Sequence, residues 1–290
     1  MGKTLGITFI FSILFCILIS KAGFSFGYQR QEGAPAAAFK KVMIVIFENT
    51  DYKKALEQPF FAKLAHEGGL MTRFFAETHP SQANYIALTS GSTQGVSGDG
   101  LVDLNVKHIG DLLEAKGKTW KVYAESYPGG CFLGAQSDTY VRKHNPFVSY
   151  KNIQNNPSRC ANIVNGAELT QDIQRSSLPD FSLYIPDLNN DGHDTGVEYA
   201  DQWFSKFFGP ILQDRHFIQD MLFVTTFDES GWFGGNQIYT SFYGDSIVPG
   251  STSNNRYDHY SLLRTIEDAL GLGTLGLDDA KASAISGVWK

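Results

Sequence analysis

Four apolar segments of this chain are each followed within two residues by an acidic residue, and this arrangement most constrains the fold. They span residues 42–47, 120–124, 181–185 and 222–227. The first and the last are continuous runs rich in branched and aromatic residues, which is typical of strands buried on both faces. Helical patterns at 59–67, 81–89, 109–116, 197–208 and 259–270 alternate with them, and 71–76 has the composition of a further strand. This alternation predicts an α/β fold with a mostly parallel sheet sandwiched between helices.

Acidic residues follow all four apolar segments. They are Glu48, before Asn49, after the first segment, Glu125 and Asp187 after the middle two, and Asp228-Glu229 after the last. Parallel strands bring their carboxyl ends to one edge of a sheet, where ligands bind in such folds. Carboxylates gathered there repel one another without a cation, so we expect one or more divalent metal ions. A single acidic residue at a strand end also serves as a helix cap, so the prediction depends on the Glu48 and Asp228-Glu229 groups together.

Ser81 directly precedes the helical pattern at 81–89, and Pro80 sets the entry of the chain into that helix. A helix N-terminus presents free backbone N–H groups and the positive end of the helix dipole, and phosphate binds readily there. A serine at this place is a candidate nucleophile when a metal ion activates its hydroxyl. The alternative is that Ser81 only caps the helix.

The segment 187–198 matches the spacing of an EF-hand calcium loop in full. Its context differs, because an apolar strand precedes it where an EF-hand has a helix. We therefore expect Asp191 and His193 to point into the phosphate site, and a calcium loop is the alternative. His144, in a polar patch of the irregular stretch 127–165, and His259, at the start of the last helix, are further candidates; a histidine in a loop is as often a surface residue.

The N-terminal segment has the pattern of a signal peptide. Lys3 precedes an apolar run at 5–19, and small residues follow at Ala22 and Gly23. We therefore expect a signal peptide at 1–22, a leader segment at 23–39, one folded domain at 40–290 and secretion into an extracellular or lumenal space. An uncleaved signal anchor is the alternative, and no other stretch is apolar and long enough to predict a stable membrane span.

Charge and cysteines restrict the partners and the compartment. Without residues 1–22 the chain keeps 22 basic and 30 acidic residues, a net charge of −8, which gives no basic footprint for nucleic acid. Cys131 and Cys160 then remain, and in an oxidising compartment they predict one disulfide that closes a loop within the irregular stretch. Two unpaired buried thiols are the alternative.

The order of these motifs resembles the phosphoesterase family, which includes bacterial phospholipases C and secreted acid phosphatases. The matching pieces are Glu48-Asn49, His79-Pro80-Ser81-x-x-Asn84-Tyr85, Asp191-x-His193-Asp194, Asp228-Glu229 and the run at 259–265. The resemblance covers residues 41–272 and implies an alkaline-phosphatase-like fold. One departure is Pro186-Asp187, where similar chains often carry Pro-Asn, and it leaves open whether Asp187 adds a second metal ligand.

The resemblance also implies a role for each residue. It implies a metal held by Glu48, Asn49, Asp228 and Glu229 and a transiently phosphorylated Ser81, with phosphate binding or proton donation by His79, Asn84, His144, Asp191, His193 and His259. Within that set we infer that His193 or His259 transfers the proton and that the other four bind phosphate. The expected substrates are small phosphate monoesters, as for an acid phosphatase. A phospholipase C acting on phospholipid and a non-catalytic phosphate- or glycan-binding protein on the same scaffold are the alternatives.

Overall fold

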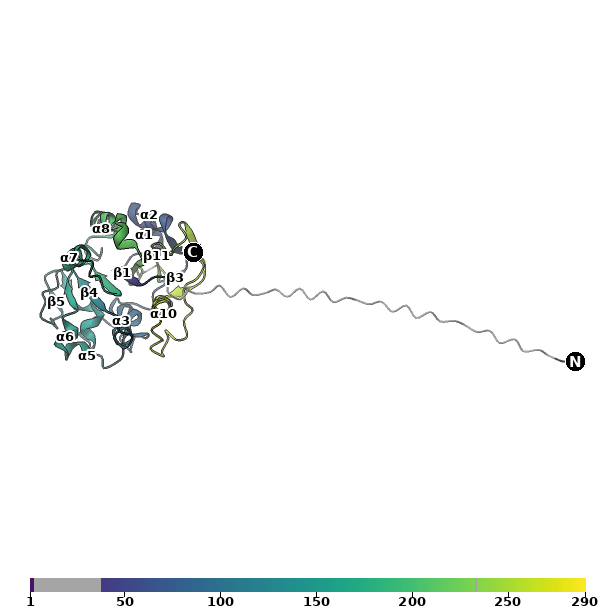
Figure 1. Ribbon diagram of the computed structural model, residues 1–290, viewed down its shortest axis with the longest axis horizontal. Coiled ribbons are helices and arrows are strands. Elements are labelled where there is room, and N and C mark those ends of the chain that lie inside the picture. The colour runs from purple at the N-terminus through teal and green to yellow at the C-terminus, as the bar shows by residue number, and fades with distance from the viewer. Residues whose placement is uncertain (3–37, 233) are drawn as a thin grey trace. The chain divides into compact units, whose positions relative to one another are not determined.

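A central sheet of eight strands organises the computed structural model, which describes residues 1–2, 38–232 and 234–290 (Figure 1). The strand order is β12–β2–β11–β9–β1–β8–β4–β7. In that order the strands span Ser251–Ser253, Gly69–Met71, Thr240–Tyr243, Met221–Phe227, Lys41–Phe47, Phe181–Ile185, Trp120–Ala124 and Ile163–Asn165. Only β11 runs antiparallel to its neighbours, β2 and β9. The predicted α/β class with a mostly parallel sheet is therefore confirmed.

Helices cover both faces of this sheet. In Figure 1, α2 (Pro59–Glu67) and α8 (Val197–Gln213) lie on one side of β1, and α3 (Gln82–Ser90) and α10 (His259–Leu270) lie on the other. The shorter helices are α1 (Tyr52–Leu56), α4 (Ile109–Ala115), α5 (Lys151–Gln154), α6 (Pro157–Cys160), α7 (Glu168–Gln174) and α9 (Arg215–Ile218), with 3-10 turns η1 (Arg142–His144) and η2 (Pro146–Ser149). Two small sheets pair β10 (Gln237–Ile238), β3 (Phe74–Phe75) and β13 (Tyr257–Asp258), and β5 (Gln136–Ser137) with β6 (Tyr140–Val141).

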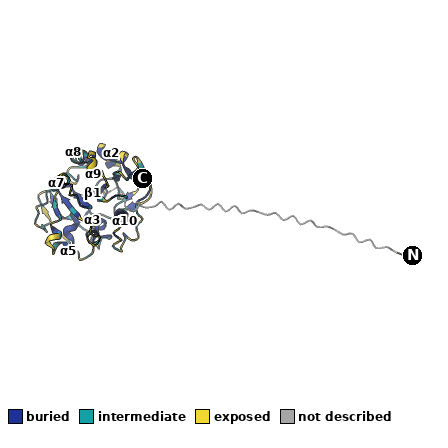
Figure 2. Cartoon of the chain, viewed as in Figure 1, coloured by how far each residue is buried: buried dark blue, intermediate teal, exposed yellow. Residues whose placement is uncertain are grey.

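The alternation of side chains along β1 places the site on the α3 face. Figure 2 shows β1 in the buried interior, and Phe47 at its end packs against Phe61 of α2 and Phe204 of α8, with ring centroids 5.0 and 4.9 Å apart. Burying a side chain of this size contributes about 2–3 kcal/mol to folding. Successive residues of a strand point to opposite faces, so the next residue, Glu48, points toward α3.

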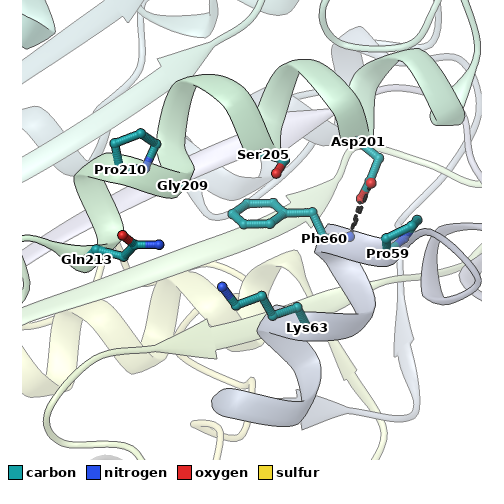
Figure 3. A pocket seen from close by; sticks show the side chains of 8 residues that line it. All are labelled: Pro59, Phe60, Lys63, Asp201, Ser205, Gly209, Pro210 and Gln213. Atoms are coloured by element: carbon teal, nitrogen blue, oxygen red, sulfur yellow. Dashed lines mark hydrogen bonds between the residues drawn. The ribbon is translucent and has the colours of Figure 1, made fainter.

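Helix α8 is joined to α2 by a buried carboxylate. Asp201 of α8 accepts hydrogen bonds from the backbone N–H groups of Phe60 and Phe61, both at 2.9 Å, and so caps the first turn of α2 (Figure 3). An open pocket of about 420 Å³ lies beside this contact. None of the predicted site residues lines it.

Four predicted elements have the same ends in the structure, four others are shifted by one residue, and larger differences occur in three places. The ranges predicted at 59–67, 120–124, 181–185 and 259–270 are confirmed as α2, β4, β8 and α10. The single strand predicted at 71–76 is wrong, because the chain turns at Thr72-Arg73 and passes from β2 in the central sheet to β3 in a small sheet. The stretch at 127–165 contains short strands and helices, and α8 continues through Pro210 beyond its predicted end.

The two cysteines of the folded part form the expected disulfide. Cys131 and Cys160 are bonded, with Cα atoms 5.6 Å apart, and they close a loop that includes η1 and η2. The predicted signal peptide and leader fall almost entirely outside the described residues. Among the helices that the structure describes, none has the length and apolar character needed to cross a membrane.

Candidate active site

Ser81 lies at the N-terminus of α3, but its hydroxyl does not cap the helix. The side chain makes no capping hydrogen bond to α3. Instead the hydroxyl donates to Glu48 Oε2 at 3.0 Å and approaches Glu229 Oε1 at 3.3 Å. The helix-cap alternative is therefore wrong, and the hydroxyl lies among the acidic residues that end β1 and β9.

Three buried carboxylates surround Ser81. Glu48, Asp228 and Glu229 follow adjacent parallel strands and are all at most 5% exposed. Burial, followed by the nearby Asp228 charge, raises the pKa of Glu48 well above its usual range. Burial, followed by the charge of Glu229, does the same to the pKa of Asp228, and burial raises the pKa of Glu229 to about 7. Carboxylates held this close need a positive charge between them to be ionised together.

Asn49 completes this group through an unusual backbone conformation. Its φ of 47° lies in the left-handed region, which asparagine adopts more readily than most residues. The chain turns there, and the backbone N–H of Asn49 donates to Asp228 Oδ1 at 3.2 Å. The turn therefore joins the ends of β1 and β9 and keeps Asn49 beside the three carboxylates.

A second cluster shares Glu48. His144 from η1 lies with Nε2 3.3 Å from Glu48 Oε2 and Nδ1 3.4 Å from Asp191 Oδ2. One ligand atom from each of the three residues falls within 4.8 Å of the others, which makes them a group that could hold a metal ion. Burial lowers the pKa of His144 well below its usual range, so its ring is neutral, the form that binds metals.

The polar atoms of both clusters fit a divalent cation. Asn49 Oδ1, Asp228 Oδ2 and Asp191 Oδ2 are buried and have no hydrogen-bond partner among the described residues. Buried polar atoms without partners are costly unless a ligand satisfies them. Carboxylate, amide and imidazole groups are the donors that hard or borderline divalent ions take.

A pocket of about 300 Å³ opens above Ser81. Its lining residues are Asn49, His79, Pro80, Ser81, Asp99, Lys143, His193, Glu229, Ser230, Gly231 and Trp232. At its mouth Trp232, which is 78% exposed, stacks on His79 with ring centroids 5.1 Å apart. His79 Nδ1 in turn lies 2.5 Å from Glu229 Oε2. The pocket thus leads from an aromatic rim to the Ser81 hydroxyl.

His193, predicted as a proton donor, belongs to the pocket wall. Its backbone N–H donates to Asp191 Oδ1 at 2.7 Å, and its Nδ1 lies 2.6 Å from Asp194 Oδ1. Its ring centroid lies 6.2 Å from that of His144. The Asp191-x-His193-Asp194 segment therefore turns one residue into the interior cluster and leaves another at the pocket.

Two predicted site residues, Asn84 and His259, belong neither to the pocket lining nor to either carboxylate cluster. The side-chain amide of Asn84 bonds the backbone of Glu77 and Thr78, at 2.8 to 3.1 Å. His259 lies behind the end of β9, where its Nε2 is 3.2 Å from the carbonyl oxygen of Phe227. Burial lowers the pKa of His259 to about 4, so its ring is neutral at mildly acidic pH. These contacts assign both side chains to holding the loops around the pocket.

The side chain of Asp187 bonds nearby loop residues and belongs to neither cluster. Its Oδ2 accepts from the hydroxyls of Ser126 and Thr139, and its Oδ1 accepts from the N–H groups of Asn189 and Asn190. Asp191 points instead toward His144, and the group of described residues that could hold a metal joins it to Glu48 and His144, not to Asp187 or Glu198, which contradicts the calcium-loop alternative.

Sequence reasoning assigned no role to three residues that the structure brings to the site. Tyr85 donates a hydrogen bond to Glu48 Oε1 and stacks on His144 with centroids 5.3 Å apart. Lys143 and Asp99 pair at 2.9 Å in the pocket wall. The position of Tyr85, four residues after Ser81 and hence on the same face of α3, was a usable signal. The sequence contains no comparable signal for Asp99, because the path of a loop brings it to the pocket.

Comparisons with known proteins show the family of this chain. The sequence profile of the Phosphoesterase family matches residues 49–273. A probable acid phosphatase of Kluyveromyces lactis is 36% identical over 262 residues, which are 86% of this chain and 62% of that protein. A phosphatidylinositol-3-phosphatase of Mycobacterium tuberculosis is 32% identical over 272 residues, 91% of this chain and 88% of that protein. The chain thus spans less than two thirds of the yeast relative.

A solved structure shows the same fold. A protein of the alkaline phosphatase superfamily from Vibrio parahaemolyticus superimposes with a TM-score of 0.59 at 14% identity, covering 87% of this chain and 72% of that one. The fold predicted from the resemblance is confirmed by this likeness. The profile match over most of the chain shows that the protein belongs to the Phosphoesterase family, on an alkaline-phosphatase-like α/β fold.

Proposed function

We propose that this protein is a metal-dependent phosphomonoesterase, of the acid phosphatase kind, that uses Ser81 as its nucleophile. The observation that carries the proposal is the position of the Ser81 hydroxyl, between Glu48 and Glu229 on the floor of a pocket and at the N-terminus of a helix. The names of its relatives, acid phosphatases and a phosphatidylinositol-3-phosphatase, support the same reaction class.

The two clusters around Glu48 would hold the metal. Glu48, Asn49, Asp228 and Glu229 form the first candidate position, and Glu48, His144 and Asp191 form a second. A bound divalent cation would supply the positive charge that lowers the pKa of a serine hydroxyl and screens an anionic substrate from the carboxylates. His144 and Asp191, predicted to bind phosphate, are reassigned in this proposal to metal binding.

The protein side chains account for the remaining chemistry. Ser81 Oγ attacks phosphorus in line with the leaving oxygen, its proton passing to an adjacent carboxylate, and the bond to the leaving group breaks. Backbone N–H groups at the start of α3 bind the equatorial oxygens. His193 at the pocket wall gives a proton to the leaving oxygen, and water then releases phosphate from Ser81.

One alternative, an enzyme that acts on lipid substrates, has specific support. The exposed ring of Trp232 beside the pocket would suit a lipid leaving group, as in a phospholipase C or a phosphoinositide phosphatase. A non-catalytic binder on this scaffold is disfavoured, because such a descendant is expected to lose one of Glu48, Ser81, Asp228 or Glu229. We also propose export from the cell, on the signal-peptide pattern of residues 1–22.

The test is hydrolysis of a chromogenic phosphomonoester beside a phosphocholine diester, across pH, with and without a chelator. We expect chelator-sensitive monoester cleavage that disappears in Ser81→Ala, while Ser97→Ala, at an exposed serine outside the pocket, keeps wild-type rates. Diester cleavage alone would favour the phospholipase C. Normal turnover by a folded Ser81→Ala protein would rule out the nucleophile.

A further inference from the structure

A carboxylate already occupies donors at the entrance to the Ser81 pocket. Asp99 Oδ1 accepts a hydrogen bond from the backbone N–H of Gln82 at 3.1 Å, which is the first residue of α3. Its Oδ2 accepts from Lys143 Nζ at 2.9 Å. One side chain thus takes both a helix N-terminal donor beside Ser81 and an ammonium group.

Among the described residues that line this pocket, Lys143 is the one with a lysine or arginine side chain. It is 19% exposed and lies between solvent and the acidic floor, close enough for Glu48 and Asp228 to act on its charge. A cation in this place, together with helix N–H groups, is the donor set that binds phosphate oxygens. In the structure the Asp99 carboxylate accepts hydrogen bonds from two of these donors, the Gln82 N–H and the Lys143 ammonium group.

We propose that Lys143 binds the phosphate group of the substrate and that Asp99 is an internal anion which the incoming phosphate displaces. This proposal rests on the proposed phosphomonoesterase function and adds the residues that set its affinity. Asp99 is suited to leave, since its side chain is 30% exposed and it comes from a loop rather than from a helix or a strand.

Charge determines which substrates the exchange favours. A phosphomonoester in its dianionic form gains more from Lys143 than a singly charged diester, and it is also repelled more by a carboxylate that stays nearby. Asp99 therefore lowers affinity for all anions at the site, and lowers it most for monoesters and for the product phosphate. The physical consequence is that the product phosphate leaves the N-terminus of α3 more readily than it would without Asp99.

A different role for Asp99 would have the opposite sign. If the carboxylate only held Lys143 in place, its removal would loosen Lys143 and weaken phosphate binding. Displacement of a competing anion predicts tighter binding. The direction of one change in affinity therefore separates the two roles.

The experiment measures binding of inorganic phosphate to the purified protein by calorimetry, and its inhibition of monoester hydrolysis. Asp99→Asn keeps an oxygen for the Gln82 N–H and removes the charge, so we expect phosphate to bind about tenfold tighter, which corresponds to about 1.4 kcal/mol. Lys143→Met should weaken binding by a similar or larger factor. Asp245→Asn, at an exposed position outside the pocket, removes the same charge and should change nothing.

The double variant and the diester complete the test. In the Lys143→Met background, Asp99→Asn should increase phosphate affinity less than it does alone, because the effect of Asp99 depends on its contact with Lys143. The gain should also be smaller for a bis-aryl phosphodiester than for the monoester. Unchanged or weaker phosphate binding in a folded Asp99→Asn protein would overturn the inference, even with full Ser81-dependent turnover. Absence of turnover in the wild type, with normal phosphate exchange at Asp99, would overturn the proposed reaction instead.

Discussion

The Tyr85 phenol donates a hydrogen bond to Oε1 of Glu48. The Ser81 hydroxyl donates to the other oxygen of the same carboxylate, at 3.0 Å. Ser81 at the N-cap of α3 and Tyr85 within it lie one helical turn apart, so one rigid element orients both the candidate nucleophile and the carboxylate shared by the two candidate metal clusters. The ring of Tyr85 also stacks on His144, which extends this control to the second cluster.

Tyr85→Phe should weaken metal binding without unfolding the protein. Loss of a group that orients a metal ligand lowers metal affinity by about 10–100-fold, and we expect a fall of that size with a matching loss of kcat/KM at low metal. Metal titration by calorimetry measures it. Tyr150→Phe is the matched control, since it also removes a buried hydroxyl bonded to α3, at Thr89, but does not touch Glu48. Equal metal affinity in both variants would contradict the positioning role.

His193→Gln and His259→Gln should have different consequences. His193 lines the pocket with a third of its side chain exposed, so its loss should lower kcat by about 10²–10⁴-fold and leave the melting temperature unchanged. His259 is buried against the Phe227 carbonyl, so its replacement should cost about 1–3 kcal/mol of stability with a smaller effect on kcat. Kinetics and thermal melting on the same samples separate the two. The reverse pattern would make His259 the proton donor.

Removal of metal should make stability depend steeply on pH. Burial raises the pKa of Asp191 to about 8 and of Glu229 to about 7, above their values in the unfolded chain. The metal-free native state therefore binds more protons than the unfolded state from about pH 4 to 8, and its stability falls as pH rises through that window. Added divalent metal should restore stability most at the alkaline end, because ligands bind in deprotonated form. Melting curves with chelator or metal from pH 5 to 9 check this; equal slopes would refute it.

Glu267→Gln should stabilise the protein at alkaline pH and leave it unchanged in acid. Glu267 of α10 is fully buried, and neither carboxylate oxygen has a hydrogen-bond partner in the described chain. Burial, followed by the charge of Asp279, raises its pKa to about 9. Stability from the protonated form is complete below about pH 4 and is lost as pH rises toward 9.

The gain of the Glu267 variant at pH 8.5 should be about 2 kcal/mol, since glutamine is neutral without taking up a proton from the solvent and keeps the shape. Urea unfolding at pH 4.5 and 8.5 measures the difference. Glu198→Gln, at an exposed position of α8, is the control for one lost negative charge. A gain of the same size at both pH values would show that ionisation of Glu267 is not its cause.

The sequence by itself determined the α/β fold and the residues at the strand ends. The apolar segments of β1 and β9 have one low-energy placement, buried and parallel, and this brings Glu48 and Asp228-Glu229 to one edge. The candidate role of Ser81 as a nucleophile was predicted from its place directly before a helical pattern. These are local consequences of side-chain period and chain entry, which is why they can be read without coordinates.

Only the tertiary structure decided what lies across from those residues. Asp99 lies on a loop, and Lys143 and His144 lie on the short 3-10 turn η1. The paths of both segments depend on contacts far along the chain, and no local period marks these residues. Asn84 and His259 also do not reach the pocket, because their polar atoms bond nearby backbone groups instead. Local patterns specify which elements form, whereas long-range packing specifies which loop side chains meet at their ends.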